Sequence, residues 1–180
     1  MAALVVTCGS GSGKAAGIEA MDALLPKDRD AYVETTRHEG VLVVRTSMDA
    51  LVAHSLLFSS LPRHIRRVVP IEQECKPDFC SIADAALTAA RKMTGRSFVV
   101  RCKTRGSTLN SDELEGAVGQ HLCQKTGLTV NLKKPDFVVY VEVVDNFAGV
   151  AALPFSLPIS MESVREDIVS SMRYISKGGV

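Results

Sequence analysis

The 180-residue sequence predicts an α+β protein made of two successive units, and three observations support this prediction. Strand-like and helical periodicities follow one another over the first half in the order βαββαβ, which is the ferredoxin-like split motif. A polar segment over 72–80, which contains Pro77, then interrupts the pattern as a linker does. The second half contains further helical and strand-like segments. We expect a ferredoxin-like domain over 1–74, an α/β domain over 81–153 and a C-terminal extension over 154–180.

The elements of the first half are bounded by turn residues. Residues 4–8 form an apolar run before a Gly/Ser loop, which is typical of a strand. In the next segment Ile18, Met21 and Leu25 have helical spacing, and Pro26 is expected to end the helix. The sequence further predicts strands over 31–38 and 41–46 joined at Glu39-Gly40, a helix over 48–61 and a strand over 65–71.

The second half begins with a predicted helix over 81–94, in which Ser81 and Asp84 suit the first turn. A strand over 97–105 and a helix that starts at Asn110 follow. Within that helix Gly116 and Gly119 each cost roughly 1 kcal/mol relative to alanine, so close packing or a close partner is expected there. The remaining elements are strands over 128–132, 137–144 (in the sheet centre) and 147–153, and a helix with the apolar stripe Met161, Val164, Ile168, Met172 and Ile175.

The strand over 97–105 has a distinctive charge pattern. Its even positions are apolar or small, whereas Arg101, Lys103 and Arg105 occupy consecutive odd positions. Because alternate residues of a strand point to opposite faces, one face packs on a core while the other carries three cations. Such a row, with residues about 7 Å apart, suits successive RNA phosphates. A solvated sheet face with some charges paired to acids is the alternative interpretation of the same pattern.

Composition limits the class of protein. The apolar fraction of 46% and charged fraction of 23% are those of a globular chain, and the net charge of +1 indicates no particular partner. No apolar run reaches the length of a membrane-spanning helix, and the first residues lack the pattern of a signal peptide. The five cysteines are scattered and are expected to be free thiols. We therefore expect a cytoplasmic protein that does not bind membranes.

Motifs for catalysis or metal binding are weak. The Gly-rich loop over 9–14 resembles a phosphate loop, but Cys8 and Ala15 occupy positions where that motif requires glycine and Ser/Thr. His54 and His64 have no metal-ligand spacing, and Cys75 and Cys80 are too far apart for a zinc half-site. We expect no catalytic residues, no metal and no cofactor. A small nucleotide-binding enzyme that uses loop 9–14 is the alternative.

Several segments together resemble a THUMP domain, which is named for thiouridine synthases, RNA methylases and pseudouridine synthases. They are the strand 98–101 with Arg105-Gly106, Val118-Gly119, and the segments 130–136 and 141–143. The resemblance covers 81–153. The first half resembles the ferredoxin-like domain that precedes THUMP domains, although its loop is Gly/Ser-rich where a Pro/Arg-containing turn is usual.

The resemblance implies a function in tRNA modification. The most similar subgroup consists of stand-alone THUMP proteins that assist tRNA cytidine N4-acetylation and carry no catalytic domain, and only about 27 residues follow the THUMP-like segment here. We therefore expect a non-catalytic protein whose partners are tRNA and a separate RNA-modifying enzyme, an acetyltransferase. Arg101 and Arg105 match the motif, and Lys103 follows from strand alternation. The expected RNA-binding residues are Arg96, Arg101, Lys103, Arg105, Lys133 and Lys134.

Overall fold

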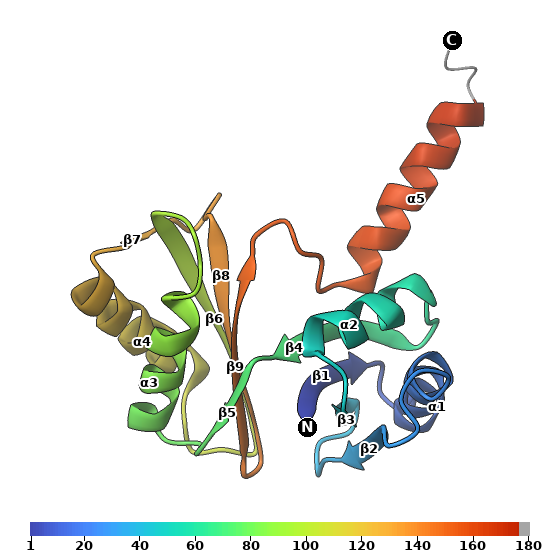
Figure 1. The fold of residues 1–180 in the computed structure, drawn as a ribbon, viewed down its shortest axis with the longest axis horizontal. Helices are drawn as coiled ribbons and strands as arrows, with labels where there is room; N and C mark the ends of the chain where they lie inside the picture. Colours follow the sequence, from blue (N-terminus) through green and yellow to red (C-terminus); the bar gives the residue numbers. More distant parts are fainter. Residues whose placement is uncertain (177–180) are drawn as a thin grey trace.

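The computed structural model describes the backbone of residues 1–176 and the side chains of residues 1–170, and it contains two β-sheets (Figure 1). The strands of the first sheet have the order β2-β3-β1-β4, and all neighbours are antiparallel. With two intervening helices this is the predicted ferredoxin-like arrangement. Its elements are β1 (Ala2–Cys8), α1 (Gly13–Leu24), β2 (Tyr32–Thr35), β3 (Val41–Thr46), α2 (Ala50–Ser59) and β4 (Ile65–Ile71).

The second sheet has five strands in the order β5-β9-β8-β6-β7. Strand β6 is parallel to both neighbours, and β8 lies in the centre, as the sequence predicts. Part of the segment expected to be a linker forms β5 at the edge of this sheet. The elements are β5 (Gln73–Cys75), α3 (Phe79–Ala90), β6 (Ser97–Arg105), α4 (Ser111–Thr126), β7 (Thr129–Val130), β8 (Phe137–Val144) and β9 (Phe147–Pro154).

The first sheet is buried on both faces, because helices cover one face and the second sheet covers the other (Figure 1). Along β1, Leu4 packs towards α1 and α2, whereas Ala3 and Val5 belong to a cluster that includes Val144 of the second sheet. A strand covered on both faces is apolar at every position, which explains why residues 3–6 are continuously apolar. Helices α3 and α4 pack on the opposite face of the second sheet.

Two helical details come from the structure. The buried face of α1 consists of Ala16, Ala20 and Leu24, whereas Ile18, one of the residues whose spacing predicts this helix, is 53% exposed. The face of α1 that packs in the core is therefore made mainly of small residues. At the start of α3 the capping residue is Asp78, whose carboxylate accepts a hydrogen bond from the Ser81 amide.

Helix α5 (Met161–Ser176) extends from the first unit and points away from both sheets (Figure 1). Met161 is buried in the core beneath α1 and α2, and Val164 packs beside it. Arg165 donates hydrogen bonds to the carbonyls of Pro62 and Arg63. The predicted stripe residues Met172 and Ile175 lie outside the side chains that the structure describes. In the described part of the chain, none of the helices has the length and apolar character needed to cross a bilayer.

Candidate nucleic-acid interface

The six cations predicted to contact RNA fall into two groups on the second unit. We call Arg101, Lys103 and Arg105 the basic row, because all three lie along β6. Arg96, Lys133 and Lys134 form the basic end, where β6 and β8 begin side by side with Phe98 opposite Phe137. The nine residues of β6 span roughly 27 Å, so the two groups form an extended strip rather than a single pocket.

A carboxylate holds the backbone of the basic end in place. Oδ2 of Asp136 accepts hydrogen bonds from the Arg96 amide at 2.8 Å and from the Ser97 amide and hydroxyl, both at 2.9 Å. These bonds, the largest from the Arg96 amide, hold the pKa of Asp136 below its usual value. Gly95 precedes them with a φ of +142°, and a Cβ there would lie 2.6 Å from the Asp136 Cβ. Only glycine suits this position.

The two lysines of the basic end lie on a turn that Asn131 organises. Its Oδ1 accepts hydrogen bonds from the amides of Lys133 and Lys134, each at 3.1 Å, and its Nδ2 donates to the Lys134 carbonyl at 2.9 Å. Lys133, Lys134 and Arg96 are exposed, and within the described residues none of them forms an ion pair. Among the described residues, the basic end therefore presents three exposed cations without an ion pair, on a backbone that Asp136 and Asn131 hold in place.

The basic row has the predicted alternation but less free charge. Phe98, Val100 and Cys102 are buried against the helices, and the cations lie at the alternate positions. Arg101 pairs with Glu115 of α4, with 3.0 Å between Nη1 and Oε1. Lys103 is exposed and makes no ion pair in the part of the chain that the structure describes.

Arg105 belongs to an ionic cluster between the two sheets, in which the carboxylate is buried and the two arginines are partly exposed. Its Nη1 lies 3.2 Å from Oε2 of Glu142, a carboxylate with no exposed surface. Arg67 of β4 approaches the other carboxylate oxygen at 2.5 Å and lies over the Tyr140 ring, with 5.6 Å from Cζ to the centroid. A buried carboxylate needs such partners. Arg101 and Arg105, which match the motif, are thus the two cations of the strip already paired within the chain.

The Gly-rich loop already binds an anionic side chain. The Glu39 carboxylate accepts a hydrogen bond from the Gly11 amide at 2.6 Å and another from the Ser10 hydroxyl at 3.0 Å. Two of the donors that a phosphate would use are therefore occupied by Glu39. Of the predicted non-ligand histidines, His54 is buried and stacked on Phe58, and His64 is bonded to Glu19. No cluster of acidic, His and Cys side chains in the described residues is arranged to hold a metal.

The sequence prediction did not assign roles to Glu115, Asn131, Asp136 and Glu142. One signal was available for Glu142, which is the only charged residue in the apolar strand 137–144. A strand apolar on both faces is buried, so its single carboxylate requires cationic partners. The sequence offers no means of choosing Arg67 and Arg105 among its 21 Lys and Arg residues.

A protein-family model matches most of the second unit. Residues 76–152 match the family model of the THUMP domain. Among curated proteins, the tRNA sulfurtransferase of Blochmanniella pennsylvanica is 42% identical over 57 residues, which cover 31% of this chain and 12% of that protein. The probable tRNA sulfurtransferase of Geobacillus thermodenitrificans is 35% identical over 78 residues, or 41% of this chain and 20% of that protein. The matches thus span a fifth or less of these relatives.

Several solved structures share the fold over 89% of this chain. PH1313 from Pyrococcus horikoshii superimposes with a TM-score of 0.67 at 19% identity, over 57% of its length. TrmN from Thermus thermophilus gives 0.61 at 20% identity over 47% of its length, and a 4-thiouridine synthetase in complex with RNA and ATP gives 0.58 at 15% over 43%. At these identities the similarity shows a common fold, and it covers both sheets.

Proposed function

We propose that this chain binds tRNA through its THUMP domain and that the basic end makes the main phosphate contacts. The observation that carries the proposal is the set of three exposed, unpaired cations, within the described residues, on a backbone fixed by Asp136 and Asn131. Such charges need no internal ion pair to be broken before they meet phosphates. The local similarity to tRNA sulfurtransferases, together with the THUMP match, supports tRNA as the RNA.

We further propose that the basic row extends the RNA-binding surface along β6. Lys103 contributes a free charge, whereas Arg101 and Arg105 contribute less because Glu115 and Glu142 partly neutralise them. Structured RNA is recognised mainly through its shape, phosphates and 2′-hydroxyls. A strip of cations on a rigid sheet suits that mode, and affinity should fall steeply as salt rises.

Charge reversal tests the RNA-binding surface. Lys133→Glu with Lys134→Glu should weaken tRNA binding by at least about tenfold and flatten its salt dependence, because each lost phosphate contact removes roughly 0.7–0.9 from the slope of log K against log salt. Mobility shift or fluorescence anisotropy with tRNA, from about 50 to 200 mM salt, measures both quantities.

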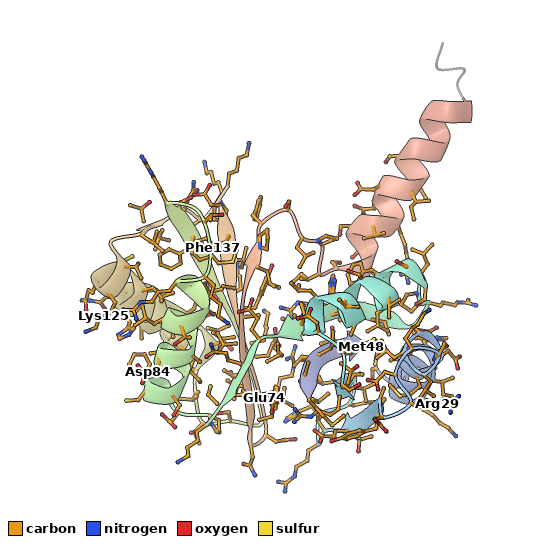
Figure 2. All side chains as sticks on the ribbon, viewed as in Figure 1. Arg29, Met48, Glu74, Asp84, Lys125 and Phe137 are labelled. Atoms are coloured by element: carbon orange, nitrogen blue, oxygen red, sulfur yellow. The ribbon has the colours of Figure 1, made fainter. Side chains whose placement is uncertain are left out.

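The matched control is Lys27→Glu with Arg29→Glu, which makes the same charge change just after α1. Figure 2 places Arg29 on the opposite side of the molecule from Phe137, where β8 begins. The control should bind tRNA nearly as the unmodified chain does. Equal losses in both variants would mean that only net charge matters, and the site assignment would be wrong.

The finer proposal is that the chain is a non-catalytic adapter that presents tRNA to a separate cytidine N4-acetyltransferase. It is supported by the resemblance of the sequence to accessory proteins of that reaction. A second candidate, RNA recognition for tRNA thiolation, is favoured by the sulfurtransferase relatives. Both place the chemistry on another catalytic unit and differ in the modified nucleoside.

Reconstitution distinguishes the two candidates. The chain is combined with tRNA and either an RNA acetyltransferase with acetyl-CoA and ATP or a thiolation enzyme with its sulfur donor, and nucleosides are quantified by mass spectrometry. An adapter for acetylation should raise N4-acetylcytidine when the chain is present, and the Lys133/Lys134 variant should not. A rise in thiouridine alone would favour the second candidate. Modification by the chain without any added enzyme would contradict the non-catalytic role.

A further inference from the structure

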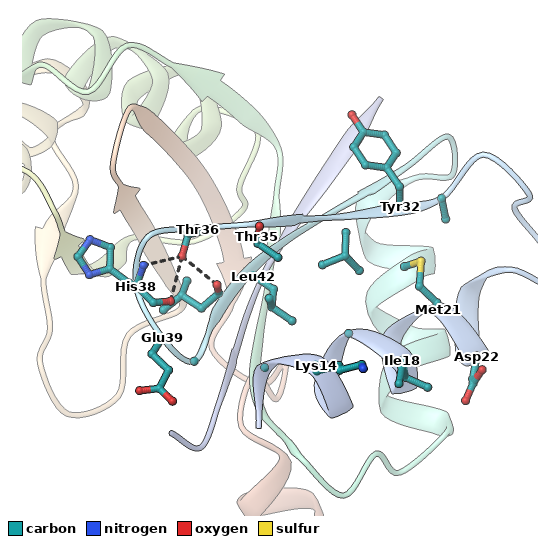
Figure 3. Close-up of a pocket in the computed structure, with 16 residues that line it drawn as sticks. Lys14, Ile18, Met21, Asp22, Tyr32, Thr35, Thr36, His38, Glu39 and Leu42 are labelled. Atoms are coloured by element: carbon teal, nitrogen blue, oxygen red, sulfur yellow. Dashed lines mark hydrogen bonds between the residues drawn. The ribbon is translucent and has the colours of Figure 1, made fainter. Parts of the chain in front are cut away.

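An apolar groove of about 790 Å³ lies on the first unit between α1 and the outer strand β2 (Figure 3). Ile18 and Met21 of α1 and Leu42 of β3 line it, together with Gly17 and Val33. Ile18 is 53% exposed, although it is an isoleucine on a helix that packs against a sheet. The groove lies on the first unit, away from the basic end of the THUMP domain.

The outer edge of β2 is an unpaired strand edge. Residues 32–35 pair with β3 on one side only, and in the described chain no hydrogen bond reaches the backbone on the other side. An open edge next to an apolar groove is the arrangement that accepts another strand, since backbone pairing and side-chain burial then occur together. The geometry therefore calls for an extended segment as the occupant.

We propose that the occupant is β2 of a second copy of this chain, so that two first sheets join into one continuous sheet across a two-fold axis. The charges on α1 support this choice. Lys14, Ile18 and Asp22 recur every four residues on the side of α1 that lines the groove. Lys14 and Asp22 are exposed, and neither forms an ion pair within the described residues.

A two-fold axis at Ile18 makes this stripe complementary to itself. The two copies of α1 run antiparallel, the two Ile18 side chains meet, and each Lys14 faces the Asp22 of the other copy. The spacing also fits. Strands lie about 4.8 Å apart, and α1 contacts both β2 and β3. Two helices seated in this way on a continuous sheet would be roughly 10 Å apart, which is a normal helix packing distance.

The register of the two β2 strands follows from the faces of the sheet. Residues directly opposite one another must point to the same face, so either Val33 or Glu34 lies on the axis. Glu34 on the axis would place two glutamates side by side, which is unfavourable. Val33 on the axis instead pairs two valines on the α1 face and places Tyr32 opposite the Glu34 of the other copy. The second register is the one we infer.

Charge exchange at Lys14 and Asp22 tests the proposal with the full chain. Sedimentation velocity over a concentration series should show a dimer of the unmodified chain in equilibrium with monomer. Lys14→Glu alone and Asp22→Lys alone should each weaken the dimer by about tenfold or more, since each creates two like-charge contacts. A mixture of the two single variants should form heterodimers, and the double variant should dimerise as the unmodified chain does.

Two results of the sedimentation experiment would contradict the proposed dimer. A chain that stays monomeric up to roughly millimolar concentration would overturn the proposal. This holds even if the groove then binds a strand of a different protein. Dimerisation that is indifferent to both single variants would overturn the arrangement.

Disulfide trapping tests the inferred register. Mild oxidation of the Val33→Cys variant should give a covalent dimer, and peptide mapping should find the introduced thiol of one copy joined to the introduced thiol of the other. Thr35→Cys is the matched control, because in the inferred register position 35 faces Ala31 and its introduced thiol should not join to itself. Efficient self-joining at position 35 in place of position 33 would overturn the register.

Discussion

Gly95 is a residue whose replacement should disturb the candidate site from outside it. Its φ of +142° is unfavourable for any other residue, and a Cβ would lie 2.6 Å from the Cβ of Asp136. Asp136 in turn holds the backbone of Arg96 and Ser97. The position therefore links backbone conformation to the placement of the basic end.

We expect Gly95→Ala to destabilise the fold by about 1–3 kcal/mol, because it combines backbone strain with a steric clash. Urea denaturation measures the change, and tRNA affinity should fall as well because the Arg96 segment shifts. Gly127→Ala is the control. Gly127 also has a positive φ, of +73°, but no atom lies within 4 Å of its Cβ position, so only the strain remains. Equal losses at the two positions would contradict the role of the clash.

Asp28 should make the free energy of unfolding depend on pH in the acid range. It is 3% exposed and accepts hydrogen bonds from the hydroxyls of Thr46 and Ser47 and from the amides of Ser47 and Asp30. These bonds, the largest from the Thr46 hydroxyl, lower its pKa to about 2. Since the folded-state pKa lies below the unfolded value, the contribution is fully present above about pH 4. It is lost as the pH falls from there towards 2.

Asp28→Asn should therefore lower stability at pH 7 and reduce the further loss between about pH 4 and 2. The amide keeps the shape, but it offers one acceptor oxygen where both carboxylate oxygens are used. Urea midpoints measured at several pH values give both quantities. Asp30→Asn, at an exposed neighbour whose side chain accepts none of these bonds, should change little. An Asp28→Asn variant with the same acid sensitivity as the unmodified chain would contradict the assignment.

At the scale of elements, α4 protects the open edge of β6. Beyond Phe98 this edge has no paired strand in the described chain, yet the Cys102 amide donates to Glu115 and the Thr104 amide donates to the Ser111 hydroxyl. Side chains of one helix thus satisfy alternate amides of the strand, which discourages pairing with another chain. Glu115 has a second contact, because it also pairs with Arg101. The position of the basic row is therefore fixed in part by side chains of α4.

The structure distinguishes the two glycines of α4, and substitution can test whether packing requires glycine at each position. A Cβ at Gly116 would meet no atom within 4 Å, and one at Gly119 would meet only Val100 Cγ2 at 3.8 Å. Internal packing, one of the two reasons expected from the sequence, does not require glycine at 116. Gly116→Ala should stabilise the chain by about 0.5–1 kcal/mol, measured by chemical denaturation. A loss of stability would show that packing does require the glycine.

At the scale of the whole molecule, Glu142 joins the two units. Its carboxylate, which has no exposed surface, receives Arg67 from the first sheet and Arg105 from the second, and both arginine side chains are mostly buried. Glu142→Ala should cost about 3–5 kcal/mol in urea denaturation, since it leaves two arginines without their anion in the interface. Glu74→Ala removes an acid that pairs with Arg45 nearer the surface and should cost much less. Similar losses from both variants would contradict a special role for the buried carboxylate.

Strands with a clear sequence pattern were predicted accurately. The predicted ranges 65–71, 97–105 and 137–144 are the ranges of β4, β6 and β8. The residues that flank these strands are glycine, histidine or charged residues, which the local sequence identifies. The apolar spacing of Ile18, Met21 and Leu25 indicated α1 but did not identify its buried face, which consists of Ala16, Ala20 and Leu24.

The α+β class, the THUMP resemblance and the alternation of cations along β6 follow from the sequence, since each is carried by runs of neighbouring residues. Which of the predicted cations are free follows from tertiary contacts. Glu142 is 75 residues from Arg67 and 37 from Arg105, and Glu115 is 14 from Arg101. An ion pair depends on distance in space, so its partners cannot be chosen from sequence spacing. Tertiary contacts therefore moved the emphasis from the arginines of the motif to Arg96, Lys133 and Lys134.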